Sequence, residues 1–410
     1  MIEPFARTAV LAVLRRINVG QLTIHDGAHT YVCGPGGAGP SASITIHDAK
    51  AWPMLLHGGT GCVDAYVDGL WDTDDLTTVF RVAARNIGRV DALRKRFGFL
   101  GTAGLRVRDA FERNTPERSR KDISAHYDLG NEMFSLMLDP KMMYSCAFFE
   151  KPGATLADAS DRKLETVCEK LDLGPDDHVV EIGTGWGGFA VYAATTRGCR
   201  VTTTTISQEQ FDVATKRVVE AGVEHLVECR LDDYREMTGQ YDKLVSLEMI
   251  EAVGHKDFGT YFAQCSKLLK ADGLMLLQAI TIDDRSYDIS KITRSFIRTY
   301  IFPNGCLPSV KVMADNVARR TNMRTIDLED YTPHYAETLR QWRTNFFSHT
   351  DELDALGYDD KFRRLWHGYL SYCEAGFEER HIGLVQMVLA KPQYRIGLHK
   401  AQEAQAAKAS

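Results

Sequence analysis

A glycine-rich run near the middle of the chain has residue types and spacing that suit a nucleotide-like cofactor. The run is Glu181-Ile182-Gly183-Thr184-Gly185-Trp186-Gly187-Gly188, and two valines precede it. The apolar residues predict a buried parallel strand, and the glycines predict a sharp turn that lets the backbone approach a ligand. A helix is expected from Phe189, with free N–H groups at its start. Dinucleotides and S-adenosylmethionine both fit such a turn, and the spacing Glu-x-Gly-x-Gly favours S-adenosylmethionine.

Strands and helices alternate around this run, which predicts an α/β fold with a doubly wound parallel sheet. The strands are expected at residues 179–182, 201–205, 226–231, 241–247 and 273–282. Ligands of such sheets bind at the carboxyl ends of the strands. Those ends are residues 183–187, 203–210, 232–234, 248–251 and 278–281. The second strand ends in three threonines instead of an acid, so the spacing assigns no partner for a ribose.

The composition of the 410 residues is that of an ordinary globular protein with two or three domains. A net charge of −6 argues against a nucleic-acid partner. The nine cysteines include no CxxC pair, which predicts reduced thiols in a cytoplasmic protein and no metal site. We find no signal peptide and no run of 18 apolar residues, so membrane contact is expected to be peripheral, at the inner face.

Residues 1–86 are expected to form a small α+β domain. A helix is predicted over residues 1–18, and three short strands follow at residues 21–25, 30–33 and 43–47. The glycine- and proline-rich loop 34–40 suggests a hairpin connection between the last two strands. Helices are expected between residues 52 and 86. The domain carries no chemistry of its own, so we expect it to present lipid or to support a homodimer.

The connecting segment 87–121 holds ten basic residues against four acids, although the whole chain is acidic. Basic residues beside apolar ones suit an anionic membrane surface, whereas a solvated linker helix is the plain alternative. Residues 122–397 then form the second domain, which begins with a lid-like stretch at 122–150 and ends in helical structure after residue 283. The tail 398–410 is expected to fray.

Five motifs together resemble the cyclopropane-fatty-acid synthase family over about residues 120–395. They are Tyr127–Gly130, Tyr144–Ala147, Glu181–Gly188, Thr205–Gln210 and Ile301–Ser309. The resemblance implies a Rossmann-like class I methyltransferase domain with S-adenosylmethionine as cofactor. It also implies a reaction in which a methyl group is added to a cis double bond of a phospholipid acyl chain at the membrane surface. A carbocation forms and loses a proton, and a cyclopropane results.

The resemblance also implies the residues of the site. The cofactor-binding residues are expected to be Tyr144, Ser145, Gly183, Thr184, Gly185, Gly187, Thr205, Gln210, Asp233 and Tyr234. Members of the family hold a bicarbonate as the base, and Cys146, Glu251 and Tyr335 match three of its ligands, with Ile280 as a backbone contact. Gln278 stands where the family has a histidine, and we count it with the catalytic residues. Glutamine can donate a hydrogen bond to bicarbonate but cannot carry a proton.

Gln278 leaves the product open. The runs 248–254 and 278–281 also look like relatives that make methyl-branched chains. In those a hydride shift precedes proton loss, a methylene group results, and a separate reductase completes the methyl branch. Ring formation is placed first and branching second. Two further alternatives are a lipid-binding protein on a non-catalytic methyltransferase scaffold and an N- or O-methyltransferase of small molecules.

Overall fold

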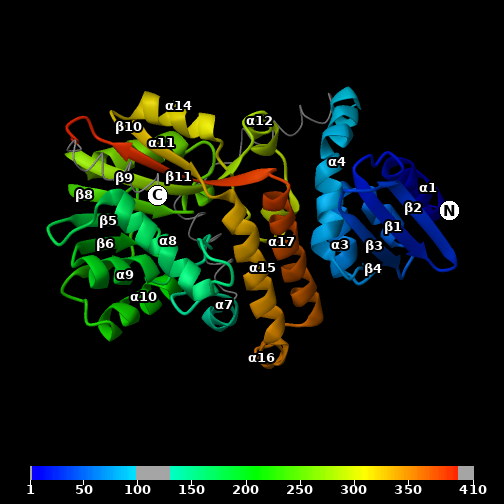
Figure 1. Ribbon diagram of the computed structural model, residues 1–410, viewed down its shortest axis with the longest axis horizontal. Coiled ribbons are helices and arrows are strands. Elements are labelled where there is room, and N and C mark those ends of the chain that lie inside the picture. The colour runs from blue at the N-terminus through cyan, green and yellow to red at the C-terminus, as the bar shows by residue number, and fades with distance from the viewer. Residues whose placement is uncertain (1, 98–129, 396–410) are drawn as a thin grey trace. The chain divides into compact units, whose positions relative to one another are not determined.

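The computed structural model describes residues 2–97 and 130–395 (Figure 1). The side chains of the basic segment 87–121 and the tail 398–410 lie outside the described residues. In the part of the chain that is described, no helix is long and apolar enough to span a bilayer. Contacts divide the chain into two compact units. Unit 1 comprises residues 1–162, 280–309 and 331–384, and unit 2 comprises residues 163–279, 310–330 and 385–410.

The amino-terminal part of unit 1 contains a four-stranded sheet with the order β2-β1-β3-β4. The strands are β1 (Gly20–Asp26), β2 (His29–Gly36), β3 (Ser41–Ile46) and β4 (Trp71–Asp72). The helices are α1 (Ile2–Leu14), α2 (Ala51–Leu55), α3 (Gly58–Val67) and α4 (Leu76–Phe97). Alternate residues of β1 are buried, including Leu22 and Ile24, so one face of the sheet packs on a core.

The expected hairpin between the second and third strands is wrong. β2 pairs antiparallel with β1, and β3 pairs parallel with the other edge of β1. The loop after β2 therefore crosses the start of β1. This crossing needs glycine, because a Cβ on Gly39 would lie 2.4 Å from the backbone nitrogen of Gly20, and a Cβ on Gly34 would lie 2.4 Å from the Gly20 carbonyl oxygen.

The second sheet has seven strands in the order β10-β11-β9-β8-β5-β6-β7. They are β5 (His178–Ile182), β6 (Arg200–Thr204), β7 (Val227–Arg230), β8 (Tyr241–Leu247), β9 (Leu269–Ile282), β10 (Arg324–Asp330) and β11 (Ile382–Ala390). β9, β8, β5, β6 and β7 run parallel, as expected. β10 and β11 form an antiparallel pair that the sequence analysis missed among the carboxyl-terminal helices.

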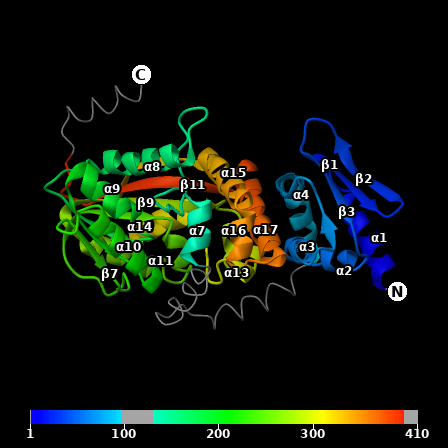
Figure 2. The ribbon, with the colours of Figure 1, turned by 90° about the horizontal axis from the view of Figure 1, so that it is seen from below.

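Helices cover both faces of this sheet, with α8, α9 and α10 on one face and α11 and α14 on the other (Figures 1 and 2). Their bounds are α8 (Leu156–Leu171), α9 (Gly188–Arg197), α10 (Gln208–Glu220), α11 (Phe258–Leu268) and α14 (Val310–Arg320). The predicted class of fold is thus confirmed: a doubly wound, mostly parallel α/β sheet with a helical carboxyl-terminal region. The shorter helices are α7 (Asn131–Met137), η1 (Ile250–Ala252), α12 (Tyr287–Ser290), α13 (Phe296–Tyr300) and α16 (Thr350–Ala355).

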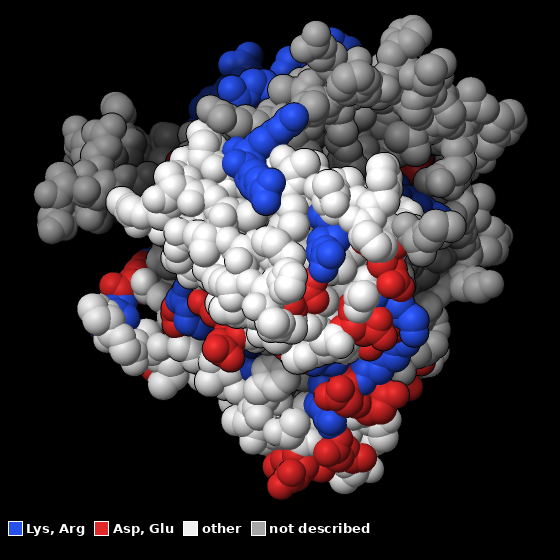
Figure 3. Space-filling model, turned by 90° about the vertical axis from the view of Figure 1, so that its right-hand side faces the viewer, with Lys and Arg blue, Asp and Glu red and all other residues white. Residues whose placement is uncertain are grey.

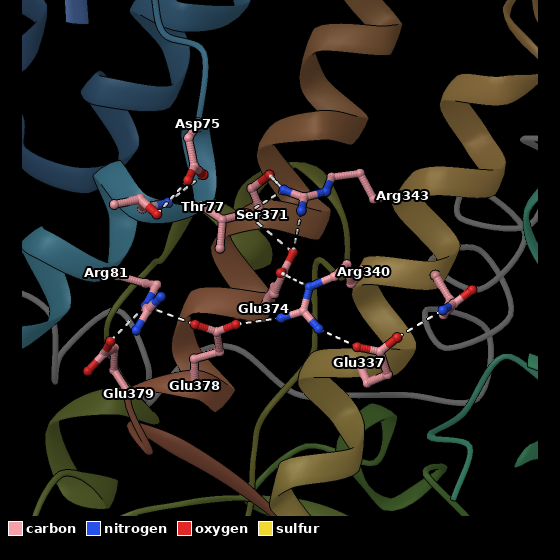
Figure 4. Close-up of polar contacts among 12 residues, drawn as sticks. Asp75, Thr77, Arg81, Glu337, Arg340, Arg343, Ser371, Glu374, Glu378 and Glu379 are labelled. Carbon is pink, nitrogen blue, oxygen red and sulfur yellow. Dashed lines mark hydrogen bonds and ion pairs between the residues drawn. The ribbon is translucent and has the colours of Figure 1, made fainter. Parts of the chain in front are cut away.

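A network of charged residues joins three long helices of unit 1 (Figure 4). The helices are α4, α15 (Thr332–Ser348) and α17 (Asp360–Glu378). On α17 the carboxylate of Glu374, which is 2% exposed, lies 3.2 Å from Arg340 and 3.0 Å from Arg343 of α15. The hydroxyl of Thr77 on α4 donates to the same carboxylate at 3.2 Å. α15 is therefore fixed by polar contacts to both neighbouring helices.

Candidate functional site

The glycine turn follows β5 and is built as the sequence predicts. Gly183, Gly185 and Gly187 all have positive φ, at 100°, 52° and 85°. A Cβ on Gly187 would lie 3.1 Å from Ala214 of α10, so this glycine allows helix packing. A Cβ on Gly185 would meet no heavy atom of the described chain within 4 Å. Gly185 therefore borders open space, which is what a backbone that approaches a ligand requires.

A buried polar group that the sequence analysis overlooked lies behind this turn. Thr203 of β6 donates to Oε2 of Glu181 at 2.6 Å, and its hydroxyl is 2.7 Å from that of Thr184. Burial raises the pKa of Glu181 to about 8, against the opposing effects of the Thr203 hydrogen bond and of the nearby Lys163. The acid was noted in the sequence only as part of the glycine motif. Thr203 could have been expected as its hydrogen-bond partner, because β5 and β6 pair in parallel and Glu181 lies opposite Thr203.

Thr205 and Gln210, both predicted to bind cofactor, are hydrogen-bonded to each other. The Thr205 hydroxyl donates to Oε1 of Gln210 at 2.8 Å, and both residues are buried. Between them, the Oγ of Ser207 accepts from the backbone N–H of Gln210 and caps α10. This cap fixes the turn at the carboxyl end of β6, on the same edge of the sheet as the glycine turn.

Asp233 and Tyr234 follow β7 at the same edge. Asp233 is 2% exposed and holds the guanidinium of Arg235 through both oxygens, at 2.8 and 2.6 Å. Tyr234 lies edge-on to Tyr261, with 5.7 Å between the ring centroids. Burial raises the pKa of the Tyr234 hydroxyl, which therefore stays protonated and can donate a hydrogen bond.

In unit 1 the lid residues Tyr144, Ser145 and Cys146 are held by α15 and α17. The hydroxyls of Tyr144 and Tyr369 lie 2.8 Å apart, and the ring of Tyr144 is 5.2 Å from that of Trp342. Cys146 is fully buried, and the hydroxyl of Thr338 lies 3.7 Å from its sulfur. Thr338 also accepts from the backbone N–H of Ala147 at 3.0 Å. These contacts fix the lid backbone on α15.

Tyr335 lies one turn before Thr338 on α15 and is 5% exposed. Its ring stacks on Phe377 at 4.2 Å and lies edge-on to Trp342 at 6.2 Å. Trp342 thus contacts both Tyr144 and Tyr335. These stacked and edge-on rings give Tyr335 and Tyr144 apolar surroundings.

In unit 2, Gln278 of β9 is fully buried between two side chains. Its Nε2 donates to Oε1 of Glu248 at 2.7 Å, and its Oε1 accepts from Nε2 of Gln386 on β11 at 3.0 Å. Glu251 lies on η1, three residues after Glu248. Neither Glu248 nor Gln386 was singled out from the sequence, and no local pattern marks a partner 108 residues away on another strand.

The candidate residues thus fall into two groups, each assembled within its own unit. Unit 2 brings together the glycine turn, the β6 and β7 turns, Glu251 and Gln278. Unit 1 brings together the lid and Tyr335. Among the described residues, no three His, Cys, Asp or Glu side chains are arranged to hold a metal ion.

Comparisons with known proteins agree with this geometry. The structure of coclaurine N-methyltransferase bound to N-methylheliamine and S-adenosylhomocysteine is similar to this one, with a TM-score of 0.60. The match covers 83% of this chain and 100% of that chain. At 18% sequence identity, this similarity shows only that the two proteins share a fold. The cyclopropane synthase MmaA2 from Mycobacterium tuberculosis has a TM-score of 0.62 at 30% identity, over 66% of this chain and 98% of that chain. The fold is that of the class I S-adenosylmethionine-dependent methyltransferases.

The family follows from the sequence comparisons. The model of the mycolic acid cyclopropane synthetase family matches residues 114–387, and the chain belongs to this family. It is 39% identical over 379 residues to the tuberculostearic acid methyltransferase UfaA1 of Mycobacterium tuberculosis, which covers 90% of this chain and 87% of the relative. It is 38% identical over 339 residues to the cyclopropane-fatty-acyl-phospholipid synthase of Escherichia coli, which covers 82% and 85%. The chain is therefore an S-adenosylmethionine-dependent methyltransferase, and its family modifies double bonds of lipids.

Proposed function

We propose that this protein adds a methyl carbon to the cis double bond of an unsaturated acyl chain in a phospholipid. The observation that carries the proposal is the open glycine turn at Gly185, in a chain that belongs to a lipid-modifying methyltransferase family. When bound, S-adenosylmethionine supplies a methyl group on a sulfonium centre. The chain's own residues must hold the acceptor in line and keep water out, because an alkene is a weak nucleophile and a carbocation reacts with water.

The cofactor is assigned to the glycine turn and the two turns beside it. Gly183, Gly185 and Gly187 bring the backbone close, and Thr184, Thr205 and Gln210 offer hydroxyl and amide groups at the same edge of the sheet. Asp233 and Tyr234 add a buried carboxylate and a neutral hydroxyl. From unit 1, Tyr144 and Ser145 are assigned to the cofactor by the family resemblance.

Proton removal is assigned to a bicarbonate, which supplies the base when it is bound. The family resemblance assigns Cys146, Glu251, Gln278 and Tyr335 to orient it. Glu251 follows the end of β8, and Gln278 of β9 pairs with Leu247, the last residue of β8, so both are near the edge of the sheet at which α/β proteins bind their ligands. Cys146 lies in the aromatic part of unit 1, where Tyr335 and Trp342 provide apolar surroundings.

We propose a methylene-branched chain as the product, although the sequence alone places ring closure first. The support is the buried Gln278, which is bonded to Glu248 and cannot itself take up a proton. A relative with 39% identity is named a tuberculostearic acid methyltransferase and not a cyclopropane synthase. A separate reductase would then complete the methyl branch. Ring closure is the second candidate, supported by the synthase from Escherichia coli with 38% identity.

Peripheral contact with the inner face of the membrane would bring the enzyme to its substrate. Two observations support it: the basic segment 87–121, and exposed apolar side chains in the amino-terminal part of unit 1. Phe5 and Val13 of α1 are 73% and 51% exposed, and Val32 of β2 is 58% exposed. The side of the molecule seen in Figure 3 has a broad area with few charged residues, and both basic and acidic residues lie at its margin.

The experiment that tests the function combines the purified enzyme, vesicles of unsaturated phospholipid and S-adenosylmethionine with a labelled methyl group. Label in the acyl chain is the expected result. Proton NMR of the extracted lipid then separates ring protons, which lie upfield, from exomethylene protons, which lie in the vinyl region. Cofactor binding without labelled lipid would favour the lipid-binding alternative, and label on a small polar acceptor would favour an N- or O-methyltransferase.

A further inference from the structure

Glu248 has an unusual backbone conformation at the carboxyl end of β8. Its φ is 53°, in the left-handed region that glycine adopts readily and that few other residues adopt. The backbone N–H of Glu248 donates to the carbonyl of Gln278 at 2.8 Å, and its carboxylate accepts from the Gln278 side chain at 2.7 Å. The first bond fixes the backbone of Glu248, and the second holds its carboxylate in place. Strained residues of this kind gather at functional sites.

The turn that contains Glu248 lies beside the glycine turn of the cofactor site. A Cβ on Gly183 would be 3.1 Å from the Cβ of Met249, the residue that follows Glu248. Both turns end parallel strands that pair with each other, β5 and β8. Glu248 is thus at the edge of the sheet where a ligand of this fold binds.

Gln386 and Glu248 together fix the orientation of the Gln278 amide. The Nε2 of Gln386 donates to Oε1 of Gln278, so the amide of Gln278 presents its own Nε2 to the carboxylate. Both glutamines are fully buried. The Oε1 of Gln386 makes no hydrogen bond within the described residues. A buried acceptor without a donor is costly, which argues that Gln386 is present for its N–H group and not for packing.

We propose that Glu248, held by Gln278 and positioned through it by Gln386, determines the product of methyl transfer by favouring the branched chain over the ring. This proposal rests on the proposed function. Methyl transfer to one alkene carbon breaks the π bond and leaves a positive charge on the other carbon. Immediate loss of a proton from the new methyl group lets its C–H electron pair close a three-membered ring. If a hydride first shifts from the methylated carbon to the charged carbon, loss of the same proton gives a C=CH₂ group.

Both routes deliver one proton to the base, so the product depends on how long the cation survives before deprotonation. A carboxylate that already accepts a charge-assisted hydrogen bond from Gln278 is a weak proton acceptor. Its fixed negative charge still stabilises a nearby cation. Glu248 therefore prolongs the life of the cation without taking its proton, and the hydride shift has time to occur. Without Gln386, the amide oxygen of Gln278 loses its donor, so the Nε2 that donates to Glu248 is held less firmly and this arrangement is weakened.

Two variants test the proposal in the labelled-methyl assay with phospholipid vesicles. Glu248→Gly should fold well, because glycine suits a φ of 53°, and it should shift the ratio of exomethylene to ring product toward the ring. Gln386→Met keeps the size of the side chain and should shift the ratio in the same direction by roughly tenfold, the scale of one hydrogen bond to a charged group. In the Glu248→Gly background, Gln386→Met should cause no further shift, because its effect acts through Glu248.

The matched control is Asn86→Leu, which removes another buried amide, one that bonds the backbone of Asn18, Val19 and Val82 in unit 1. It should lower the melting temperature and leave the product ratio unchanged. An unchanged ratio in active Gln386→Met enzyme, an equal shift in Asn86→Leu, or a wild-type product that is all ring would each overturn the proposal. Wild-type enzyme that labels no lipid would instead overturn the proposed function, and this inference with it.

Discussion

The hydroxyl of Thr203 donates to the carboxylate of Glu181 at 2.6 Å across the paired strands β5 and β6, and both side chains are buried. Burial dominates and raises the pKa of Glu181 from 4.5 to about 8. In the folded protein Glu181 thus keeps its proton up to about pH 8, whereas in the unfolded chain it loses the proton near pH 4.5. The cofactor-free enzyme should therefore lose stability as pH rises from about 4.5 to about 8, since the native state binds more protons over this window.

Glu181→Gln removes this titration while it keeps an acceptor for Thr203. Its free energy of unfolding should match that of the wild type near pH 4.5 and exceed it at pH 8, by an amount on the order of 1–3 kcal/mol. Urea unfolding at several pH values measures the difference. Glu224→Gln, a change of an exposed acid, is the control. Parallel pH profiles for wild type and Glu181→Gln would contradict the expectation.

The glycine turn allows a test that separates ligand binding from packing. Gly185→Val places a branched side chain in open space beside the backbone, so cofactor affinity should fall by on the order of 100-fold or more, with a modest loss of stability from the positive φ. Gly187→Ala places its Cβ against Ala214 and should chiefly lower the melting temperature. Calorimetry with S-adenosylmethionine and thermal unfolding measure the two effects. Unchanged affinity in Gly185→Val would remove the cofactor from this turn.

The sequence predicted the parts of the molecule that local pattern controls. The apolar strand and three glycines at residues 179–188 predicted the strand β5 and the glycine turn after it, because strand periodicity and positive φ both leave local signals. The arrangement of the amino-terminal sheet was not predictable in this way. A glycine-rich loop indicates a reversal of the chain, but it does not tell which strand the next strand pairs with. Here β3 pairs with β1 and not with β2, the strand just before it.

Side-chain pairs between distant segments were also beyond the sequence. Gln278 was noticed because it replaces a family histidine, but its partners Glu248 and Gln386 became visible only when β8, β9 and β11 were placed in one sheet. The strands β10 and β11 were missed because they follow long helical segments. The contact between Tyr144 and Tyr369 was also not predicted, because the two residues are 225 positions apart in the sequence.

The charge network on α15 and α17 gives a prediction for stability. Glu374→Gln leaves Arg340 and Arg343 without the buried carboxylate that they share, and the free energy of unfolding should fall by about 3 kcal/mol. Asp315→Asn breaks the exposed pair with Lys311 on α14 and should cost far less, because solvent screens an ion pair at the surface. Denaturant unfolding measures both variants. Equal losses would show that the network contributes no more than a surface ion pair.

The basic segment predicts recruitment by anionic lipid. Binding to anionic vesicles should weaken as salt rises, because screening shortens the range of the attraction. Neutralising Arg94, Lys95 and Arg96 together should weaken it further, at roughly 1 kcal/mol for each charge. Vesicle sedimentation at several salt concentrations measures this, with uncharged vesicles as the control. If neither salt nor the triple change has an effect, the exposed apolar residues of the amino-terminal part become the better explanation of membrane contact.

Glu251 is expected to serve proton removal and not cofactor binding. Its place on η1, three residues after the strained Glu248, puts it just beyond the carboxyl end of β8. Loss of one preorganised partner of a reacting group typically costs on the order of 10²–10³ in rate. Glu251→Gln should therefore lose activity on that scale and keep its affinity for S-adenosylmethionine.

Bicarbonate and Gln278 complete this test. Removing bicarbonate from the wild type should slow lipid methylation, and adding it back should restore the rate. Gln278→His should stay active and move the product toward the ring, because an imidazole can accept the proton that an amide cannot. The labelled-methyl assay under bicarbonate-free gas, followed by NMR of the lipid, measures rate and product together. Full activity of Glu251→Gln, or a wild-type rate that is indifferent to bicarbonate, would mean that the proton leaves by another route.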